Sequence, residues 1–373
     1  MALLKFELKK LLASKRLIFT ITIIILGILF LIIRNYSLQS YVEREEVIEV
    51  ESYLEVIYNE IQQYEYVLRL QPDDEDTINL LNESRLLRDT LIDWRSALNE
   101  EDWELPLQLE NQFLNQLKFY TEIGGISPIS LKQIEKELLF NHYLLDHHIK
   151  PEHDQYSLSF PIFFSQTIKL FTNIGAYILL LLVIGDLVTS EYERNSIRLL
   201  LTQPINRHKL MFAKYSVAMI LYFSMLIITI ISTYILGKLF GKSGTFQYPV
   251  MIEYKGNFSF ITINQYIGQS IILTTFMISV ILALIIFYSI IFKNTILMTV
   301  ALLVTTMIGF IFIDHHDISI ISYLNPLQTL IPENSITYQN VMLWYDTIPV
   351  QIIFTITLLL LSILILRRTR IGS

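Results

Sequence analysis

The sequence contains no cysteine and few charged residues. Without cysteine, no disulfide can hold any part of the chain together, and metal sites or nucleophiles built on thiolates are excluded. Only 17% of the 373 residues are charged, whereas 53% are hydrophobic and the mean hydropathy is +0.47. These values are too apolar for an ordinary soluble domain, so they indicate an integral membrane protein.

Catalytic signatures are also missing. There is no HExxH zinc-protease motif and no GxSxG nucleophile motif. The stretch GKLFGKS (237–243) resembles a phosphate-binding loop, but it has three residues between the first glycine and Gly-Lys-Ser, where that loop needs four. Histidines and aspartates gather at 142–154 and in DHHD (314–317), yet their spacing fixes no ligand geometry. We therefore expect no metal site, no catalytic residue and no nucleotide hydrolysis by this chain.

Six long apolar segments account for the composition. A helix needs about 20 apolar residues to cross the ~30 Å hydrocarbon core of a bilayer. The first segment is not a cleaved signal peptide, because it lacks a small-residue cleavage site. The expected fold is an all-α integral membrane protein whose six transmembrane helices cover about residues 17–33, 171–188, 217–236, 266–288, 296–313 and 347–366.

Lysine and arginine orient these spans. With the N-terminus inside the cell, 14 basic and three acidic residues fall in residues 1–16, in 189–214, at Lys293 and in the C-terminal tail. The opposite orientation would place all of these basic residues outside, against the positive-inside rule. Both termini are therefore expected to be cytoplasmic.

Residues 1–16 are basic and amphipathic. Leu4, Leu8, Leu11 and Leu12 share one helical face, and the lysines lie off it. This pattern predicts a helix that lies in the membrane interface before the first span, so residues 1–34 form an amphipathic entry helix and that span. A basic flank that only sets orientation is the alternative.

An acidic block separates the first two spans. Residues 34–160 contain 26 acidic and 10 basic residues, whereas the rest of the chain contains 9 and 18. Apolar residues recur every three or four positions from Leu38 to Leu70, and three shorter helical patterns follow before Pro151. We expect residues 35–160 to form a helical extracytoplasmic domain inserted between spans one and two. It is either a solvated spacer or a receptor that concentrates cationic cargo.

The remaining part, 161–373, carries spans two to six, a cytoplasmic segment at 189–214 and an external loop at 314–346. In the cytoplasmic segment, Ser190 can cap a helix and Pro204 can end it. A short amphipathic helix at about 190–203, rigidly joined to two spans, is predicted. An ordinary juxtamembrane loop with snorkelling arginines remains the alternative.

The run GDLVTSEYERNSIRLLLTQPINRHKLMFAK (185–214) resembles the exit of the second span in bacterial ABC-2-type transporter permeases. The segment ISYLNPLQTL (321–330), the six spans, the cytoplasmic termini and the entry helix are similar as well. The resemblance implies the permease subunit of an ATP-driven exporter in the cell membrane of a bacterium. Its partners would be cytoplasmic ABC ATPase subunits, which bind the ATP, and a second permease, identical or homologous. No cofactor of its own is implied.

In these permeases the short helix after the second span couples the membrane helices to the ATPase. The resemblance implies an ATPase-coupling role for Glu191, Glu193, Arg194, Ile197, Arg198, Leu200, Pro204 and Arg207. Because an acidic outer domain attracts cations, the substrate is expected to be a cationic or amphipathic peptide or another toxic compound. Membrane lipid surrounds the chain, and no nucleic-acid partner is expected. The alternative function is a membrane sensor or adaptor whose outer helical domain recognises a ligand.

Overall fold

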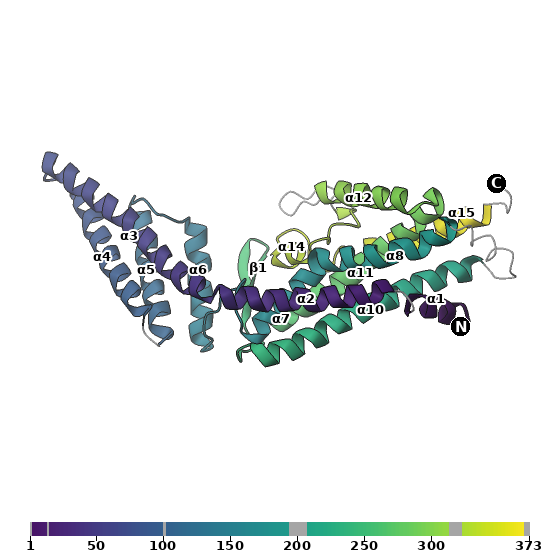
Figure 1. The fold of residues 1–373 in the computed structure, drawn as a ribbon. Helices are drawn as coiled ribbons and strands as arrows, with labels where there is room; N and C mark the ends of the chain where they lie inside the picture. Colours follow the sequence, from purple (N-terminus) through teal and green to yellow (C-terminus); the bar gives the residue numbers. More distant parts are fainter. Residues whose placement is uncertain (1, 13–14, 100–101, 194–206, 313–322, 369–373) are drawn as a thin grey trace. The chain divides into compact units, whose positions relative to one another are not determined.

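The computed structural model describes residues 2–12, 15–99, 102–193, 207–312 and 323–368 (Figure 1). The chain forms two compact units. One comprises Met1–Ile32, Phe160–Phe246 and Ile252–Ser373, and the other comprises Ile33–Ser159 and Gln247–Met251. We call the first the membrane unit, because it holds almost all of the apolar sequence, and the second the acidic unit.

The acidic unit contains four helices, and each lies on one of the four helical patterns of the acidic block: α3 Gln39–Leu70, α4 Glu75–Ala97, α5 Glu104–Glu122 and α6 Leu131–Asp146. Side-chain caps explain two of the starts. The Asp74 carboxylate accepts a hydrogen bond from the Thr77 backbone N–H before α4, and Ser130 does the same for Gln133 before α6. These caps satisfy N–H groups that have no partner inside the helix.

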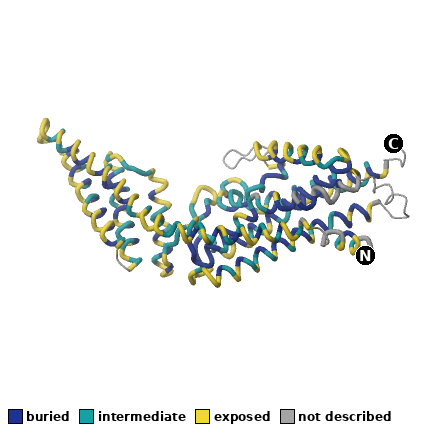
Figure 2. Tube along the Cα trace, in the orientation of Figure 1, coloured by how far each residue is buried: buried dark blue, intermediate teal, exposed yellow. Residues whose placement is uncertain are grey.

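Aromatic residues form the centre of the acidic unit. Phe113 of α5 stacks on Tyr53 of α3 with ring centroids 5.5 Å apart, and it lies 5.9 Å from Trp94 of α4. The hydroxyls of Tyr64 and Tyr120 are hydrogen-bonded at 2.8 Å inside the same core. Figure 2 shows buried faces turned inward and exposed faces turned outward in this unit. The acidic residues therefore lie mainly on its surface while aromatic and leucine side chains hold it together.

The membrane unit begins with α1 Ala2–Leu12 and contains four helices that are long and apolar enough to cross a membrane: α2 Lys15–Ser37, α10 Arg207–Phe240, α11 Ile263–Phe292 and α15 Ile348–Arg368. A fifth predicted span is α12 Thr295–Ile311, a shorter apolar helix of 17 residues. The second predicted span lies in a composite element, α7 Phe160–Leu170, the π-helical turn η1 Phe171–Gly175 and α8 Ala176–Glu193. The all-α membrane architecture is thus present, with four helices meeting the length requirement among the described residues.

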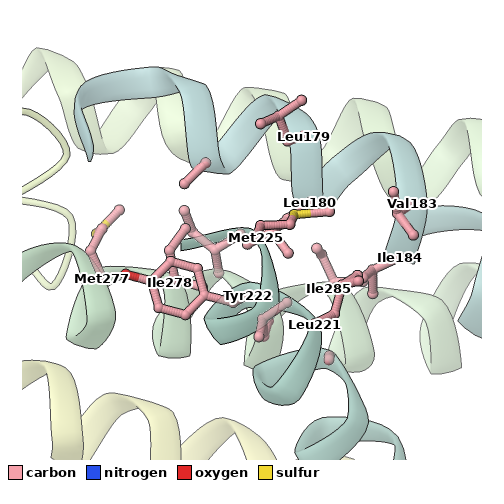
Figure 3. Packing of buried hydrophobic residues seen from close by; sticks show 14 of the residues in the cluster. Leu179, Leu180, Val183, Ile184, Leu221, Tyr222, Met225, Met277, Ile278 and Ile285 are labelled. Atoms are coloured by element: carbon pink, nitrogen blue, oxygen red, sulfur yellow. The ribbon is translucent and has the colours of Figure 1, made fainter. Parts of the chain in front are cut away.

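Helix α11 is the core of the membrane unit. Of its most apolar stretch, 72% is buried, against 22–33% for α2, α10 and α15. Figure 3 shows Ile278 and Ile285 of α11 packed among side chains of α8 and α10, including Leu180, Ile184 and Leu221. A helix that is apolar on every side is stable only when surrounded, and α11 occupies that place.

A small β-sheet was not part of the sequence prediction, which found no strand. Strands β1 Pro249–Tyr254 and β2 Asn257–Thr262 form a hairpin, and β3 Tyr338–Gln339 pairs with β1 in parallel. The two-residue turn Lys255–Gly256 has positive φ at both positions, 50° and 81°, as the tight hairpin turn of this twist requires. The strands are six residues long each, and their turn lacks the Asn-Gly or Asp-Gly pair that usually marks a hairpin, so the sequence held no strong local signal for them.

The segment that contains NPLQ (325–328) packs against two apolar helices. Asn325 donates its side-chain N–H to the backbone carbonyl of Gly309 in α12 at 2.8 Å, and Gln351 of α15 donates to the carbonyl of Pro326 at 3.2 Å. A Cβ at Gly309 would lie 2.3 Å from the Leu327 side chain, so this approach needs glycine. The DHHD motif at 314–317 lies outside the described residues.

The carboxyl group of Glu110 makes the stability of the acidic unit depend on pH. Burial raises the pKa of Glu110 in α5 to about 8; the nearby amide of Asn141 opposes the shift, and the carboxylates of Glu137, Glu49 and Glu46 add to it. A folded-state pKa above the ordinary 4.5 means that the folded unit holds this proton more tightly than the unfolded chain. The corresponding stability is complete below pH 4.5 and is lost as the pH rises through about 8.

We therefore predict that the thermal midpoint of the acidic unit falls between pH 6 and pH 9, and that Glu110→Gln removes most of this fall because an amide carries no proton to lose. The measurement is tryptophan fluorescence of the full chain with Trp344→Phe, which leaves Trp94 and Trp103 in the acidic unit as reporters. Exposed Glu55 on α3 offers the control Glu55→Gln, which should keep the wild-type pH profile. An unchanged profile in Glu110→Gln would contradict the prediction.

Candidate functional site

The structure describes both flanks of the predicted coupling segment. Glu193 is the last residue of α8, Glu191 lies in the same last turn, and Arg207 is the first residue of α10. The remaining predicted coupling residues lie outside the described residues: Arg194, Ile197, Arg198, Leu200 and Pro204. The site can therefore be built from the two helix ends that hold residues 194–206.

The end of α8 is fastened to the beginning of α12. The Glu193 carboxylate accepts a hydrogen bond from the Thr295 backbone N–H at 2.8 Å. The Asn294 side chain accepts from the next two N–H groups, those of Ile296 and Leu297, at 2.9 and 3.1 Å. Three of the four N–H groups at this helix start are thus satisfied, and the negative charge of Glu193 meets the positive end of the helix dipole. Glu193 is a structural link as well as part of the segment.

A second contact lies in α8 one turn before Glu193. The hydroxyls of Thr189 and Thr295 are hydrogen-bonded to each other, and Thr189 is fully buried. Lys293, which precedes α12, has φ 54° and ends α11 in a left-handed cap. The turn from α11 to α12 is therefore tight, and the end of α8 is held against it at two points.

The beginning of α10 is fastened to the entry helix α1. The Lys214 ammonium lies 3.4 Å from the Glu7 carboxylate, and each side chain is about 1% exposed. Leu4 and Leu8 on the same face of α1 pack against the apolar core. Two charges this far from solvent are tolerated only while they face each other, so this pair fixes α1 against α10.

The first turns of α10 also contact the ends of two further helices. Leu210 and Met211 form one buried cluster with Ile286 and Ile290 of α11 and Leu366 of α15. The start of α10 is therefore packed directly on the central helix α11. One flank of residues 194–206 is tied to α12, and the other is tied to α1, α11 and α15.

Sequence reasoning missed Glu7 and the cap formed by Asn294. Both had a signal. Glu7 is the only acidic residue among the first 16 and falls three positions after Leu4, on the apolar face of α1, where an acid needs a buried partner. Asn294 stands directly before an apolar run, which is a common helix start. The partners of both residues are distant in sequence, so the contacts themselves were not predictable.

The histidines of the acidic unit are engaged in separate contacts. His153 lies 3.3 Å from Glu45, His148 lies 3.2 Å from Glu104, and His147 stacks on Tyr143. In the part of the chain that the structure describes, no group of three or more histidine, aspartate or glutamate side chains could hold a metal ion.

We predict that Lys214→Met destabilises the membrane unit by about 3–5 kcal/mol, because the change leaves the buried Glu7 carboxylate without the ammonium that faces it. The swap of Glu7→Lys with Lys214→Glu should recover a large part of the loss. Thermal unfolding of the full chain in detergent measures both effects. Lys209, an exposed lysine on the same helix, supplies the control Lys209→Met, which should match the wild type. If the charge-swapped double variant lost as much stability as the single variant, a specific pairing of the two residues would be contradicted.

A family model described as ABC-2 family transporter protein matches residues 1–366, almost the whole chain. No curated protein and no solved structure gives a significant match.

Proposed function

We propose that this chain, which belongs to the ABC-2 family of transporter proteins, is the permease of a bacterial exporter that a separate ATPase drives through residues 190–203. The chain is a transmembrane permease of an ABC transporter, and membership of this family implies an ABC ATPase as partner. Export as the direction, the coupling helix and the class of substrate are our proposal. A second permease, identical or homologous, would complete the assembly, and the partner ATPase would bind the ATP.

One observation carries the proposal: four pieces that are distant in sequence, and that the charge bias places in the cytoplasm, meet at one end of the membrane unit. Glu7 of α1 pairs with Lys214 of α10, Glu193 of α8 caps α12, and Leu366 of α15 packs on Leu210. Such a meeting is expected if both termini and residues 189–214 share one side of the membrane. We therefore propose six spans, with α12 and the composite α7–α8 among them and the acidic unit outside the cell.

The fixed flanks explain how a short segment can move long helices. A push on residues 194–206 enters α8 and α12 through Glu193 and enters α10, α1 and α11 through Lys214 and Leu210. Buried contacts of this kind shift as blocks, because packed interiors do not deform continuously. ATP-driven closure of two ATPase subunits would then rearrange the spans and alternate the access of the substrate.

The chain supplies no nucleotide site of its own in this proposal. The stretch GKLFGKS begins inside α10, whose last residue is Phe240, and no helix starts after it as a phosphate-binding loop requires. The substrate is proposed to be a cationic or amphipathic peptide or another toxic compound. The acidic unit supports this, since a negative surface raises the local concentration of cations.

The topology makes a prediction that the natural absence of cysteine makes simple to test. A single cysteine at exposed Asn82 of α4 should react with a membrane-impermeant maleimide added to sealed cells, whereas one at exposed Lys209 should react only after permeabilisation. The wild type, without cysteine, is the background control. Labelling of the Lys209→Cys chain in sealed cells would place the coupling segment outside and end the proposal.

The coupling role predicts that Arg198→Glu combined with Arg207→Glu lowers transport and permease-dependent ATPase activity at least tenfold, because two cations facing the partner become anions. Both activities are measured in proteoliposomes with the co-purified ATPase. Lys242→Glu, a charge reversal at an exposed position beyond the other end of α10, should leave them unchanged. Full activity of the double variant, or the absence of any co-purified ATPase, would contradict the proposal.

A further inference from the structure

A charged cluster in the membrane unit lies far along the chain from the coupling segment. The Lys169 ammonium, at the end of α7, is 2.8 Å from the carboxylate of Glu333. Glu333 is the second residue of α14 Pro332–Thr337. The ammonium also lies 5.3 Å from the ring centroid of Tyr266 in α11. Three elements therefore meet around one ammonium group.

The Lys169 ammonium is surrounded by the kinds of group that bind ammonium ions, a carboxylate and an aromatic ring. Its charge is met by a carboxylate, and an aromatic face attracts a cation through its quadrupole. The second oxygen of Glu333 accepts a hydrogen bond from the side-chain N–H of Asn173 in η1 at 3.4 Å, which fixes the carboxylate between two donors. Lys169 and Glu333 are each 32% exposed, so the pair, unlike Glu7–Lys214, is accessible from outside the packed core.

Two amide oxygens, one on η1 and one on α11, are buried without a hydrogen bond. Asn173 must turn its N–H group toward the Glu333 carboxylate, and its carbonyl oxygen is buried without a hydrogen bond. The carbonyl oxygen of Gln269, one turn after Tyr266 on α11, is buried without a hydrogen bond as well. Both atoms can only accept, so a molecule that satisfied them would bring N–H or O–H groups.

The backbone is irregular at this point. Asn173 lies in the π-helical turn η1, and π-helical turns occur frequently at functional sites. A Cβ at Gly175 would lie 2.5 Å from the carbonyl oxygen of Leu170, so the turn depends on glycine there. The irregular turn begins directly after Leu170, one residue beyond Lys169, and holds Asn173, and both side chains contact Glu333 of α14.

We propose that Glu333, Tyr266 and Asn173 form a binding site for an ammonium group of the transported molecule, and that the Lys169 ammonium holds this site until cargo replaces it. The inference rests on the proposed transport function and narrows the substrate to molecules that carry a primary amine. Exchange of one ammonium for another keeps Glu333 neutralised throughout. The four-carbon stem of lysine allows its ammonium to withdraw while the helices stay in place.

The first experiment removes the Lys169 ammonium from the site and supplies propylammonium in its place. Lys169→Ala removes the atoms that propylammonium would replace, so in the full chain in lipid nanodiscs propylammonium chloride should raise the thermal midpoint of this variant by several degrees. Propan-1-ol should not. The double variant Lys169→Ala with Glu333→Gln should not respond to propylammonium, and neither should Lys118→Ala, which removes an exposed lysine paired with Glu135. Equal responses of the single and double variants, or none in either, would overturn the proposal.

The second experiment keeps Lys169 and serves if its removal prevents folding. A fluorescent amphipathic peptide of leucine and lysine should bind the wild-type chain, and the same peptide with acetylated lysines should bind at least tenfold more weakly. Glu333→Gln should weaken binding of the lysine peptide at least tenfold, whereas Glu135→Gln, which alters an exposed carboxylate of the acidic unit, should not. Equal binding of both peptides, or no effect of Glu333→Gln, would overturn the proposal.

Neither experiment uses an ATPase or measures transport. A negative result would therefore remove the ammonium site and leave the permease assignment and its coupling segment standing. Loss of ATPase co-purification would instead contradict the proposed coupling, and it would not alter the measured response of the site to propylammonium.

Discussion

The buried pair of Glu7 and Lys214 is the interaction on which the arrangement of the membrane unit depends. Both charges are withdrawn from solvent, and each compensates the other at 3.4 Å. Burial makes separation costly, so α1 and the beginning of α10 behave as one body. The cap that Glu193 gives α12 has the same consequence on the other flank. The two helix ends that flank residues 194–206 are thus each fastened to a neighbouring helix, as the proposed coupling requires.

The membrane unit contains two charged pairs that differ in exposure and, in our proposal, in role. Glu7 and Lys214 are about 1% exposed and face each other inside the packed core, which suits a fixed connection between α1 and α10. Lys169 and Glu333 are 32% exposed, are close to an aromatic ring and have unsatisfied amide oxygens beside them, which suits a site where partners exchange. Helix α11 connects the two, because Ile286 and Ile290 lie in the cluster with the start of α10 while Tyr266 lies near its other end. In the proposed mechanism, a movement at the Glu7–Lys214 pair therefore reaches the ammonium site at Glu333 along the buried helix α11.

Local sequence signals predicted most of the helices and few of the contacts. The recurrence of apolar residues from Leu38 to Leu70 predicted α3, whose bounds are Gln39–Leu70. The second predicted span, about residues 171–188, lies in a helical element that starts at Phe160 and passes through a π-helical turn, and Lys169 and Asn173 concealed that earlier start. The hairpin at 249–262 was missed because its strands are short and its turn, Lys255–Gly256, lacks the Asn-Gly or Asp-Gly pair that usually marks a hairpin. Of the predicted site, Glu193 acquired a specific partner, Thr295, that no spacing in the sequence could reveal.

The sequence by itself determined that the chain is a helical membrane protein with an acidic helical insert, because hydropathy, charge and periodicity are properties of neighbouring residues. It also determined the family, because the runs at 185–214 and 321–330 are contiguous. Only the tertiary structure decided which charges face each other. Glu7 and Lys214 are about two hundred positions apart, as are many contacts around α11, and such partners are selected by the packing of helices that the bilayer and the buried core bring together. The proposed function depends on those partners, since the coupling and the ammonium site that we propose both consist of contacts between distant parts of the chain.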